Sequence, residues 1–70
     1  MKVKTFVKTA LNTINTFVVN DIQGNFICTV FKGDCEKDKY SYPILNKTVH
    51  TFTVQEDENG FLYYVIFVKA

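Results

Sequence analysis

This chain contains no arginine and no tryptophan, and it has a single histidine and a single proline. All 8 basic residues are lysines, and 7 acidic residues nearly balance them to leave a formal net charge of +1. Proteins that read bases or grip phosphates commonly use the bidentate fork of arginine. The missing arginine and the near-neutral net charge therefore argue against a protein that reads nucleic-acid sequence. A net charge this small also gives no electrostatic attraction toward a strongly charged partner.

Long apolar runs are missing as well. No stretch approaches the roughly 20 apolar residues that span a membrane, and the N-terminal sequence MKVK opens no apolar segment of signal-peptide length. We therefore expect a cytoplasmic protein. In that reducing compartment Cys28 and Cys35 should be free thiols, Cys28 as a small core residue and Cys35 in a loop. Their spacing matches neither a C-x-x-C redox motif nor a zinc site.

Reactive groups are sparse. His50 has no serine, cysteine or carboxylate partner at a catalytic spacing, so we expect a solvated strand residue there. The acidic clusters at residues 34–38 and 56–58 do not match the calcium-binding loop pattern. The 3 scattered glycines form no phosphate loop. We predict no catalytic residues, no metal site and no cofactor, and hence that the protein is not an enzyme.

Core-forming residues, by contrast, are abundant. The chain is 47% hydrophobic and contains 7 phenylalanines and 4 tyrosines, which excludes a disordered tail on composition. Its 70 residues suffice for one domain, close to the size at which a single core becomes marginal. We therefore predict one domain over residues 1–70.

The N-terminal segment has helical periodicity. Its apolar residues form one stripe, consisting of Val3, Phe6, Val7, Ala10, Leu11 and Ile14. This spacing predicts an amphipathic helix at about residues 4–12, with Phe6 and Leu11 as core anchors. Thr5 and Thr9 are weak helix formers, so packing against the rest of the fold must stabilise this helix.

Two β-hairpins should follow the helix. Four β-rich segments lie at Thr16–Asn20, Asn25–Phe31, Thr48–Gln55 and Phe61–Val68. Asp21 and Gly24 suit the first loop, and Asn59-Gly60 is a strong signal for a two-residue turn in the second. The connection between the hairpins carries Pro43 and can hold a short helical turn. The predicted class is α+β: an N-terminal amphipathic helix packed on a four-stranded, largely antiparallel sheet made of two β-hairpins, with strand order left open.

The two-residue turn predicts which side chains share a face of the sheet. It places Phe52, Val54, Phe61, Tyr63, Val65 and Phe67 on the core face, and it places Tyr64, Ile66 and Val68 on the opposite face. A helix about 10 Å across cannot cover a four-stranded sheet about 19 Å wide. We therefore expect the face with Tyr64, Ile66 and Val68 to be the interface of a homodimer. The alternative is that residues 40–46, with Tyr40, Tyr42, Ile44 and Leu45, fold over it.

The order of these segments, KVKTFVKTAL, VVNDIQGN, ILNKTVHTFTV and NGFLYYVIFV, resembles small accessory proteins of phages and mobile elements of Gram-positive bacteria. In those proteins a short amphipathic helix precedes a strand–turn–strand unit, and a leucine-rich segment precedes a final hairpin. The resemblance covers most of the chain and carries no catalytic signature. It implies an accessory protein whose targets vary. The chain departs from the pattern in its extra connection, DCEKDKYSYP, and in its lack of arginine.

Two classes of function are compatible with these features. The first is a non-enzymatic protein-interaction module, such as an inhibitor or adaptor of a host protein, that acts through a sheet face or edge. The alternative is a small nucleic-acid-binding module that uses N-terminal lysines and exposed tyrosines, with contacts at Lys2, Lys4, Lys8, Tyr40 and Tyr42. The near-neutral net charge and the lack of arginine favour the protein-interaction module over the nucleic-acid-binding module.

Overall fold

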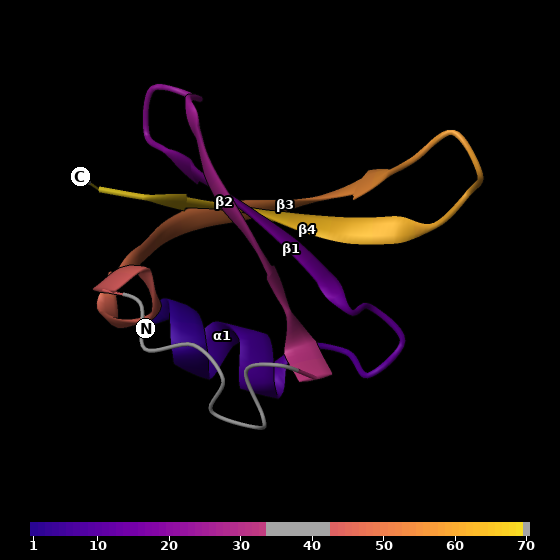
Figure 1. Cartoon of the computed structure of the whole chain (residues 1–70), viewed down its shortest axis with the longest axis horizontal. Coiled ribbons are helices and arrows are strands. Elements are labelled where there is room, and N and C mark those ends of the chain that lie inside the picture. The colour runs from indigo at the N-terminus through magenta and orange to yellow at the C-terminus, as the bar shows by residue number, and fades with distance from the viewer. Residues whose placement is uncertain (34–42, 70) are drawn as a thin grey trace.

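The computed structural model describes residues 1–33 and 43–69 of the chain. Its elements are the helix α1 (Val3–Thr9), the strands β1 (Thr16–Asp21) and β2 (Phe26–Phe31), the 3-10 helix η1 (Pro43–Asn46), and the strands β3 (Val49–Glu56) and β4 (Leu62–Val68). The strands form one sheet in the order β2-β1-β4-β3 (Figure 1). The predicted α+β class, with an N-terminal helix and a four-stranded sheet, is confirmed.

The sheet is mixed. The pairs β1–β2 and β3–β4 are antiparallel hairpins, whereas β1 and β4 run parallel at the centre. The prediction of a largely antiparallel sheet therefore needs a correction at its middle pair. Apolar periodicity predicts strands and turns but says nothing about the direction in which two hairpins meet. The parallel pair lies between the two hairpins, where it is buried as parallel strands usually are.

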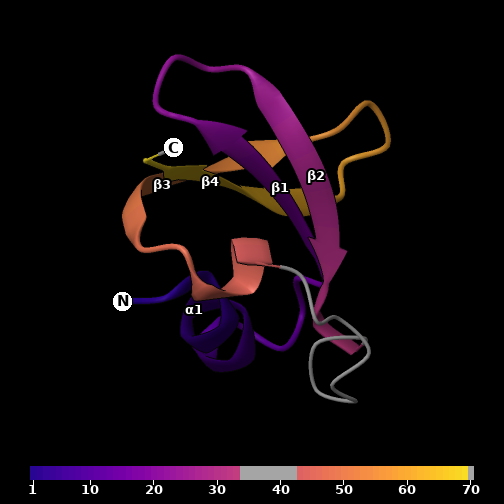
Figure 2. The same ribbon diagram turned by 60° about the vertical axis from the view of Figure 1, so that its left-hand side comes forward.

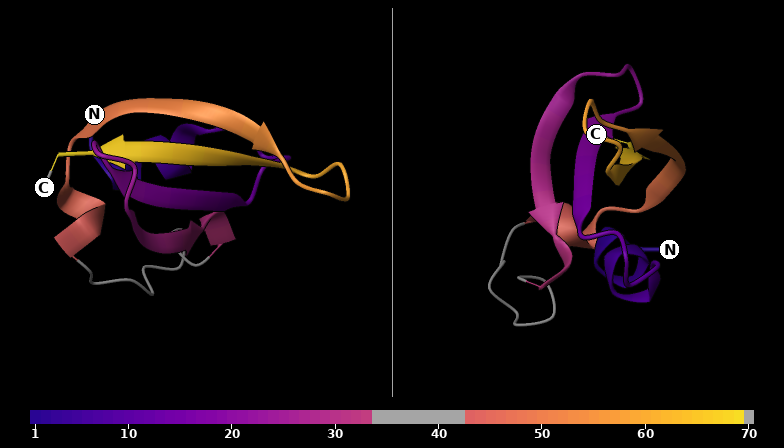
Figure 3. Two further views of the ribbon diagram at one scale, coloured as in Figure 1. Left: turned by 90° about the horizontal axis from the view of Figure 1, so that it is seen from above. Right: turned by 90° about the vertical axis from the view of Figure 1, so that its right-hand side faces the viewer.

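The helices lie on one side of the sheet. Figure 2 shows α1 and η1 beneath the strands, and Figure 3 shows the sheet from above with no described element over it. We call the side that carries α1 the helix side and the opposite one the far side. The core cluster lies on the helix side and contains Val3, Phe6, Val7, Ile14, Phe17, Val19, Val30, Leu45, Tyr64, Ile66 and Val68.

Aromatic rings join α1 to the central strands. The ring of Phe6 stands edge-on to Tyr64, with centroids 5.3 Å apart, and edge-on to Phe17 at 6.2 Å. The rings of Phe17 and Tyr64 are stacked at 5.4 Å with only 8° between their planes. Such pairs add to the stabilisation from buried area. One aromatic cluster therefore holds the helix on the parallel pair.

The helix is shorter than predicted. It ends at Thr9, because Ala10 has extended backbone angles (φ −68°, ψ 167°). At this end the ammonium of the buried Lys32 donates a hydrogen bond to the Ala10 carbonyl. A cation beside a helix C-terminus is favoured because the helix dipole is negative there. Leu11 thus falls beyond the helix and is 64% exposed, so its assignment as a core anchor was wrong. Phe6 is confirmed as a core residue.

The β3–β4 loop spans more residues than predicted. Asp57 donates its backbone N–H to the Phe61 carbonyl at 2.9 Å, and Gly60, with φ 85°, donates to the Asp57 carbonyl at 3.1 Å. These bonds close a loop over residues 57–61 instead of a two-residue turn at Asn59-Gly60. Val54 therefore pairs with Tyr64, not with Val65. A shift of one residue turns every side chain of a strand to the opposite face.

This shift overturns the predicted interface. Tyr64, Ile66 and Val68 lie beneath α1 in the core, and their side chains are 8%, 0% and 0% exposed. They do not form the exposed face that the sequence predicted. The alternative prediction is confirmed in part, because Leu45 belongs to the same core cluster as Tyr64, Ile66 and Val68, and Ile44 packs against that cluster. Tyr40 and Tyr42, the rest of that cover, lie outside the described residues.

Candidate functional site

Strand β3 forms an open edge of the sheet. It pairs with β4 on one side only, and all of its residues from position 50 to 56 are exposed. The N-terminal segment covers only its beginning, where Val49 donates its N–H to the Met1 carbonyl at 2.8 Å. Beyond that point, within the described residues, the outer side of β3 faces no other strand.

The backbone groups that point outward belong to Phe52 and Val54. Because the Asp57 N–H points toward Phe61 at the start of β4, strand alternation turns the N–H and C=O groups of Thr53 and Gln55 toward β4 as well. The groups of Phe52 and Val54 therefore point away from the sheet. An edge of this kind is a template for pairing with another strand.

An apolar strip accompanies this edge on the helix side. It consists of Phe52, Val54 and Leu62, whose side chains are 49%, 47% and 51% exposed; we call these three residues the edge strip. The ring of Phe6 lies 4.8 Å from the Phe52 ring. The β3–β4 hairpin then continues past the end of α1 (Figure 1), which leaves Val54 and Leu62 without a covering helix.

A groove between α1 and β3 leads into the edge strip. It has a volume of about 490 Å³, and its lining includes Met1, Phe6, Ala10, Phe52 and Tyr64. Most of these side chains are apolar, and such grooves accept apolar side chains of a partner. The open edge, the edge strip and the groove form one continuous candidate site.

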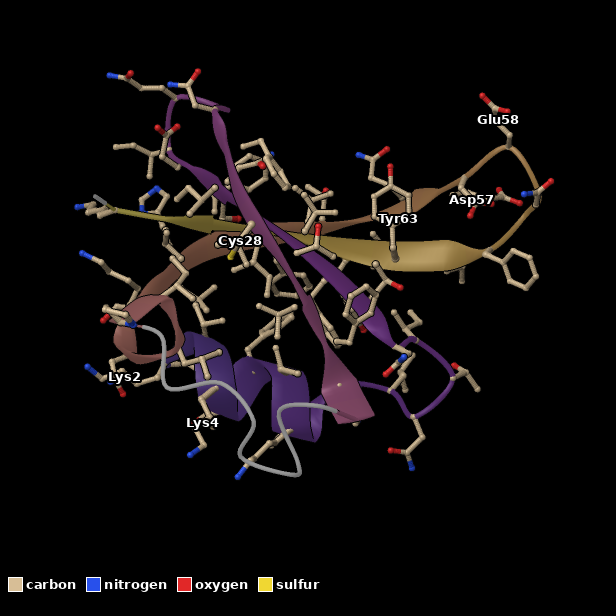
Figure 4. All side chains as sticks on the ribbon, viewed as in Figure 1. Lys2, Lys4, Cys28, Asp57, Glu58 and Tyr63 are labelled. Atoms are coloured by element: carbon tan, nitrogen blue, oxygen red, sulfur yellow. The ribbon has the colours of Figure 1, made fainter. Side chains whose placement is uncertain are left out.

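Charges are separated along the molecule. Figure 4 shows Asp57 and Glu58 at the tip of the β3–β4 hairpin, with Lys2 and Lys4 at the opposite end. His50 lies at the other end of β3 from this acidic tip, as the extra residue of a bulge between Val49 and Thr51. It is exposed, as predicted.

The far side of the sheet is a weaker candidate. Its central apolar residues, Val18, Val65 and Phe67, are buried or half-buried although no described element covers them. On β2, by contrast, Phe26 and Phe31 are 65% and 41% exposed. The Oδ1 atom of Asn20 is buried there without a hydrogen-bond partner among the described residues. Thr51 and Thr53 make the β3 end of this face polar. The exposed apolar side chains of the far side thus lie on β2, at the opposite edge of the sheet from β3.

Cys28 lies on β2, half-buried against the core, with its thiol free. Burial raises the pKa of this thiol. Because the thiolate is the nucleophilic form, a raised pKa makes the group inert. Cys28 is therefore a packing residue, and Cys35 lies outside the described residues.

The lysines and tyrosines of the nucleic-acid alternative do not gather on one described surface. Lys2 donates its ammonium to the Asn46 carbonyl at 2.8 Å, and Lys4 and Lys8 lie one turn apart on α1. Tyr64 is buried in the core, and Figure 4 shows Tyr63 across the sheet from the lysines. Tyr40 and Tyr42 fall outside the described residues.

In the part of the chain that the structure describes, no three histidine, cysteine or acidic side chains lie close enough together to hold a metal ion. No described helix has the length and apolar character needed to cross a bilayer.

Sequence reasoning assigned Phe52 and Val54 to the buried core and so missed the candidate site. Two signals could have found it. The segment from Thr51 to Gln55 has no lysine or proline, the residues that commonly protect edge strands. Both loops also share an Asp-x-x-Gly pattern, at Asp21 and at Asp57, which predicts a longer loop than Asn59-Gly60 alone.

Comparison with known proteins finds no matching family model, no matching curated protein and no matching solved structure. The resemblance to phage and mobile-element accessory proteins therefore stays a prediction.

Proposed function

We propose that this protein is a non-enzymatic protein-interaction module that binds an extended segment of a partner by adding it as a strand beside β3. One observation carries the proposal: the outward backbone groups of Phe52 and Val54 lie directly beside the exposed edge strip. Strand addition uses both features, because main-chain hydrogen bonds supply affinity and alternate side chains supply specificity.

The edge strip indicates the pattern of the bound segment. Side chains of an added strand alternate between the two faces of the sheet. Those on the helix side meet Phe52 and Val54 and can enter the groove beside Phe6, so they should be apolar. The segment should also carry a basic residue near the hairpin tip, where Glu56, Asp57 and Glu58 stand together in the sequence.

A selection from a library of displayed peptides tests this proposal. The wild-type protein is expected to enrich peptides in which every second residue is apolar. Val54→Pro removes an outward N–H that the fold itself does not use, so it should weaken binding about tenfold. Phe52→Lys should weaken it as well by disrupting the edge strip. Leu11→Lys is the matched control for exposed apolar surface and should bind like the wild type.

Two results would contradict the proposal. One is enrichment without alternation, with binding that ignores Val54→Pro. The other is no enrichment together with binding of labelled single-stranded nucleic acid that falls steeply with salt, which would select the nucleic-acid alternative.

A further inference from the structure

We infer that the strand that fits the β3 edge is β3 of a second copy, paired antiparallel about a two-fold axis at Thr53. This inference rests on the proposed strand-addition function and names its partner. It joins the two sheets into one, with the open edge of each copy satisfied by the other. Because each copy has one such edge at β3, the pairing closes at a dimer.

The backbone limits the registers that two β3 strands can adopt. In an antiparallel pair, the sum of the two paired residue numbers is constant. An even sum pairs the outward groups of Phe52 and Val54 with outward groups, and it keeps the helix sides of both sheets on the same side. An odd sum pairs outward groups with inward ones. Only registers centred on a residue therefore make hydrogen bonds.

The register centred on Thr53 is self-complementary. Phe52 then pairs with Val54 of the second copy, so apolar meets apolar on the helix side. On the far side Thr51 lies opposite Gln55, a pair of polar side chains. At the ends, His50, the extra residue of the β3 bulge, comes near Glu56 of the second copy, which brings an imidazole toward a carboxylate. Each of these pairs occurs twice because of the symmetry.

The neighbouring registers are worse. Centring the axis on Val54 would put Phe52 opposite the carboxylate of Glu56. Centring it on Phe52 would put His50 opposite Val54, and it would require the edge at Val49, where the Met1 carbonyl already accepts the N–H. The stretch that Met1 leaves open, from His50 to Glu56, has Thr53 at its centre.

Pairing in this register also covers the edge strip. The side chains of Phe52 and Val54 are 49% and 47% exposed in one copy. In the dimer Phe52 packs beside Val54 of the second copy, and Val54 packs beside its Phe52. The apolar strips of the two copies then become one band across the new central strand pair. Burial of that surface adds to the main-chain hydrogen bonds.

Charges placed at Thr53 test the axis directly. Thr53 is exposed on the far side, so the fold tolerates either sign. In the dimer this residue faces only itself. Thr53→Lys and Thr53→Glu should therefore each raise the dissociation constant of the dimer about fivefold or more through like-charge repulsion. An equimolar mixture of the two variants should restore the dimer, as a heterodimer.

The measurement is sedimentation equilibrium, supported by native mass spectrometry with one variant isotope-labelled. The wild type should sediment at twice the 8.1 kDa chain mass at high concentration. Circular dichroism of each variant confirms that it is folded. The matched control is the same pair of changes at Thr51, which faces Gln55 and not itself. Thr51→Lys and Thr51→Glu should show no preference for the heterodimer when mixed.

Three outcomes would overturn the inference. A wild type that stays monomeric at millimolar concentration removes the second copy as occupant. A dimer insensitive to charge at Thr53 places the contact elsewhere. A heterodimer preference at Thr51 instead moves the axis. None of these outcomes contradicts the proposed function. If the protein binds extended peptides and Val54→Pro abolishes this binding, strand addition to a different protein is still supported.

Discussion

The two hairpins have the same turn but very different outer strands. In the β1–β2 loop, the Asp21 carboxylate accepts the N–H groups of Gln23 and Asn25 at 2.9 Å each. In the β3–β4 loop, the Asp57 carboxylate accepts those of Asn59 and Phe61, also at 2.9 Å each. The glycines of both loops have positive φ, 89° at position 24 and 85° at position 60. The Asp-x-x-Gly pattern therefore builds one local structure twice.

Burial of the outer strands does not follow this similarity. One row across the helix side runs from Val30 on β2 through Phe17 and Tyr64 to Val54 on β3. The valines at its two ends are 1% and 47% exposed. Val30 belongs to the core cluster with residues from outside the sheet, such as Ile14 and Leu45, whereas Val54 does not. The second layer, and not the strands, thus decides which edge is available for binding.

The largest expected effect comes from placing the same charge at both ends of this row. Val30→Lys buries an ammonium in the core, where an uncompensated charge costs about 3–5 kcal/mol, enough to unfold a marginal domain. Val54→Lys should cost less than about 1 kcal/mol, because its side chain can reach water from an exposed position. Urea titrations of both variants measure the difference. Equal costs would mean that the two edges are equally covered.

An intermediate effect tests the similarity of the two turns. Gly24→Ala and Gly60→Ala each force a side chain into the left-handed region, at about 1 kcal/mol each. No neighbouring atom obstructs the new Cβ closely at either site, so backbone strain alone sets the cost. Gly33→Ala, where the Cβ meets nothing and no positive φ is required, is the control. In thermal unfolding, Gly24→Ala and Gly60→Ala should lower the melting temperature by similar amounts, and Gly33→Ala should lower it less. Unequal decreases at positions 24 and 60 would show that the two turns differ.

The smallest effect concerns pH and the first turn. The Asn25 N–H lowers the pKa of the Asp21 carboxyl from its ordinary 3.8, and the Asn25 amide and the Gln23 N–H add to this against the opposing effect of desolvation. Because the folded pKa is lowered, this carboxylate contributes stability above pH 3.8 and loses it as the pH falls through the lower folded value. The stability difference between the wild type and Asp21→Asn should therefore shrink in acid.

Two measurements check this prediction. A carbon-detected titration of the Asp21 carboxyl should give a midpoint below 3.8. Urea unfolding of both proteins at neutral and at acid pH should show the difference narrowing. A stability difference that grows in acid would mean that folding raises the pKa of Asp21 instead of lowering it.

Local patterns predicted much of the secondary structure correctly. Each strand was placed within one residue of its observed ends, and the segment at Pro43 does contain a short helix. Phe6 was correctly assigned to the core from helical periodicity alone. These features depend on residues close together in the sequence, whose turn chemistry and apolar spacing are visible without the fold.

Predictions that depended on packing failed at identifiable residues. Leu11 continues the apolar stripe, but the chain leaves the helix at Ala10 and so exposes it. Lys32 is buried with its ammonium bound to the Ala10 carbonyl, a contact that no local pattern indicated. Tyr64 moved from a predicted interface to the core because the β3–β4 register shifted by one residue. The exposure of Leu11 depends on how the chain packs after the helix, whereas the register error came from expecting a two-residue turn where the local Asp-x-x-Gly pattern builds a longer loop.

The amino-acid sequence by itself determined the elements: a short amphipathic helix, two Asp-x-x-Gly turns and four apolar strands, because neighbouring residues set backbone angles and periodicity. Only the tertiary structure decided that the hairpins meet through a parallel pair, and that residues from outside the sheet bury Val30 at the β2 end of a row but leave Val54 exposed at the β3 end. The physical reason is area. A helix of 7 residues covers only part of a four-stranded sheet, and the part of β3 that continues past it keeps both its free backbone groups and the exposed apolar side chain of Val54.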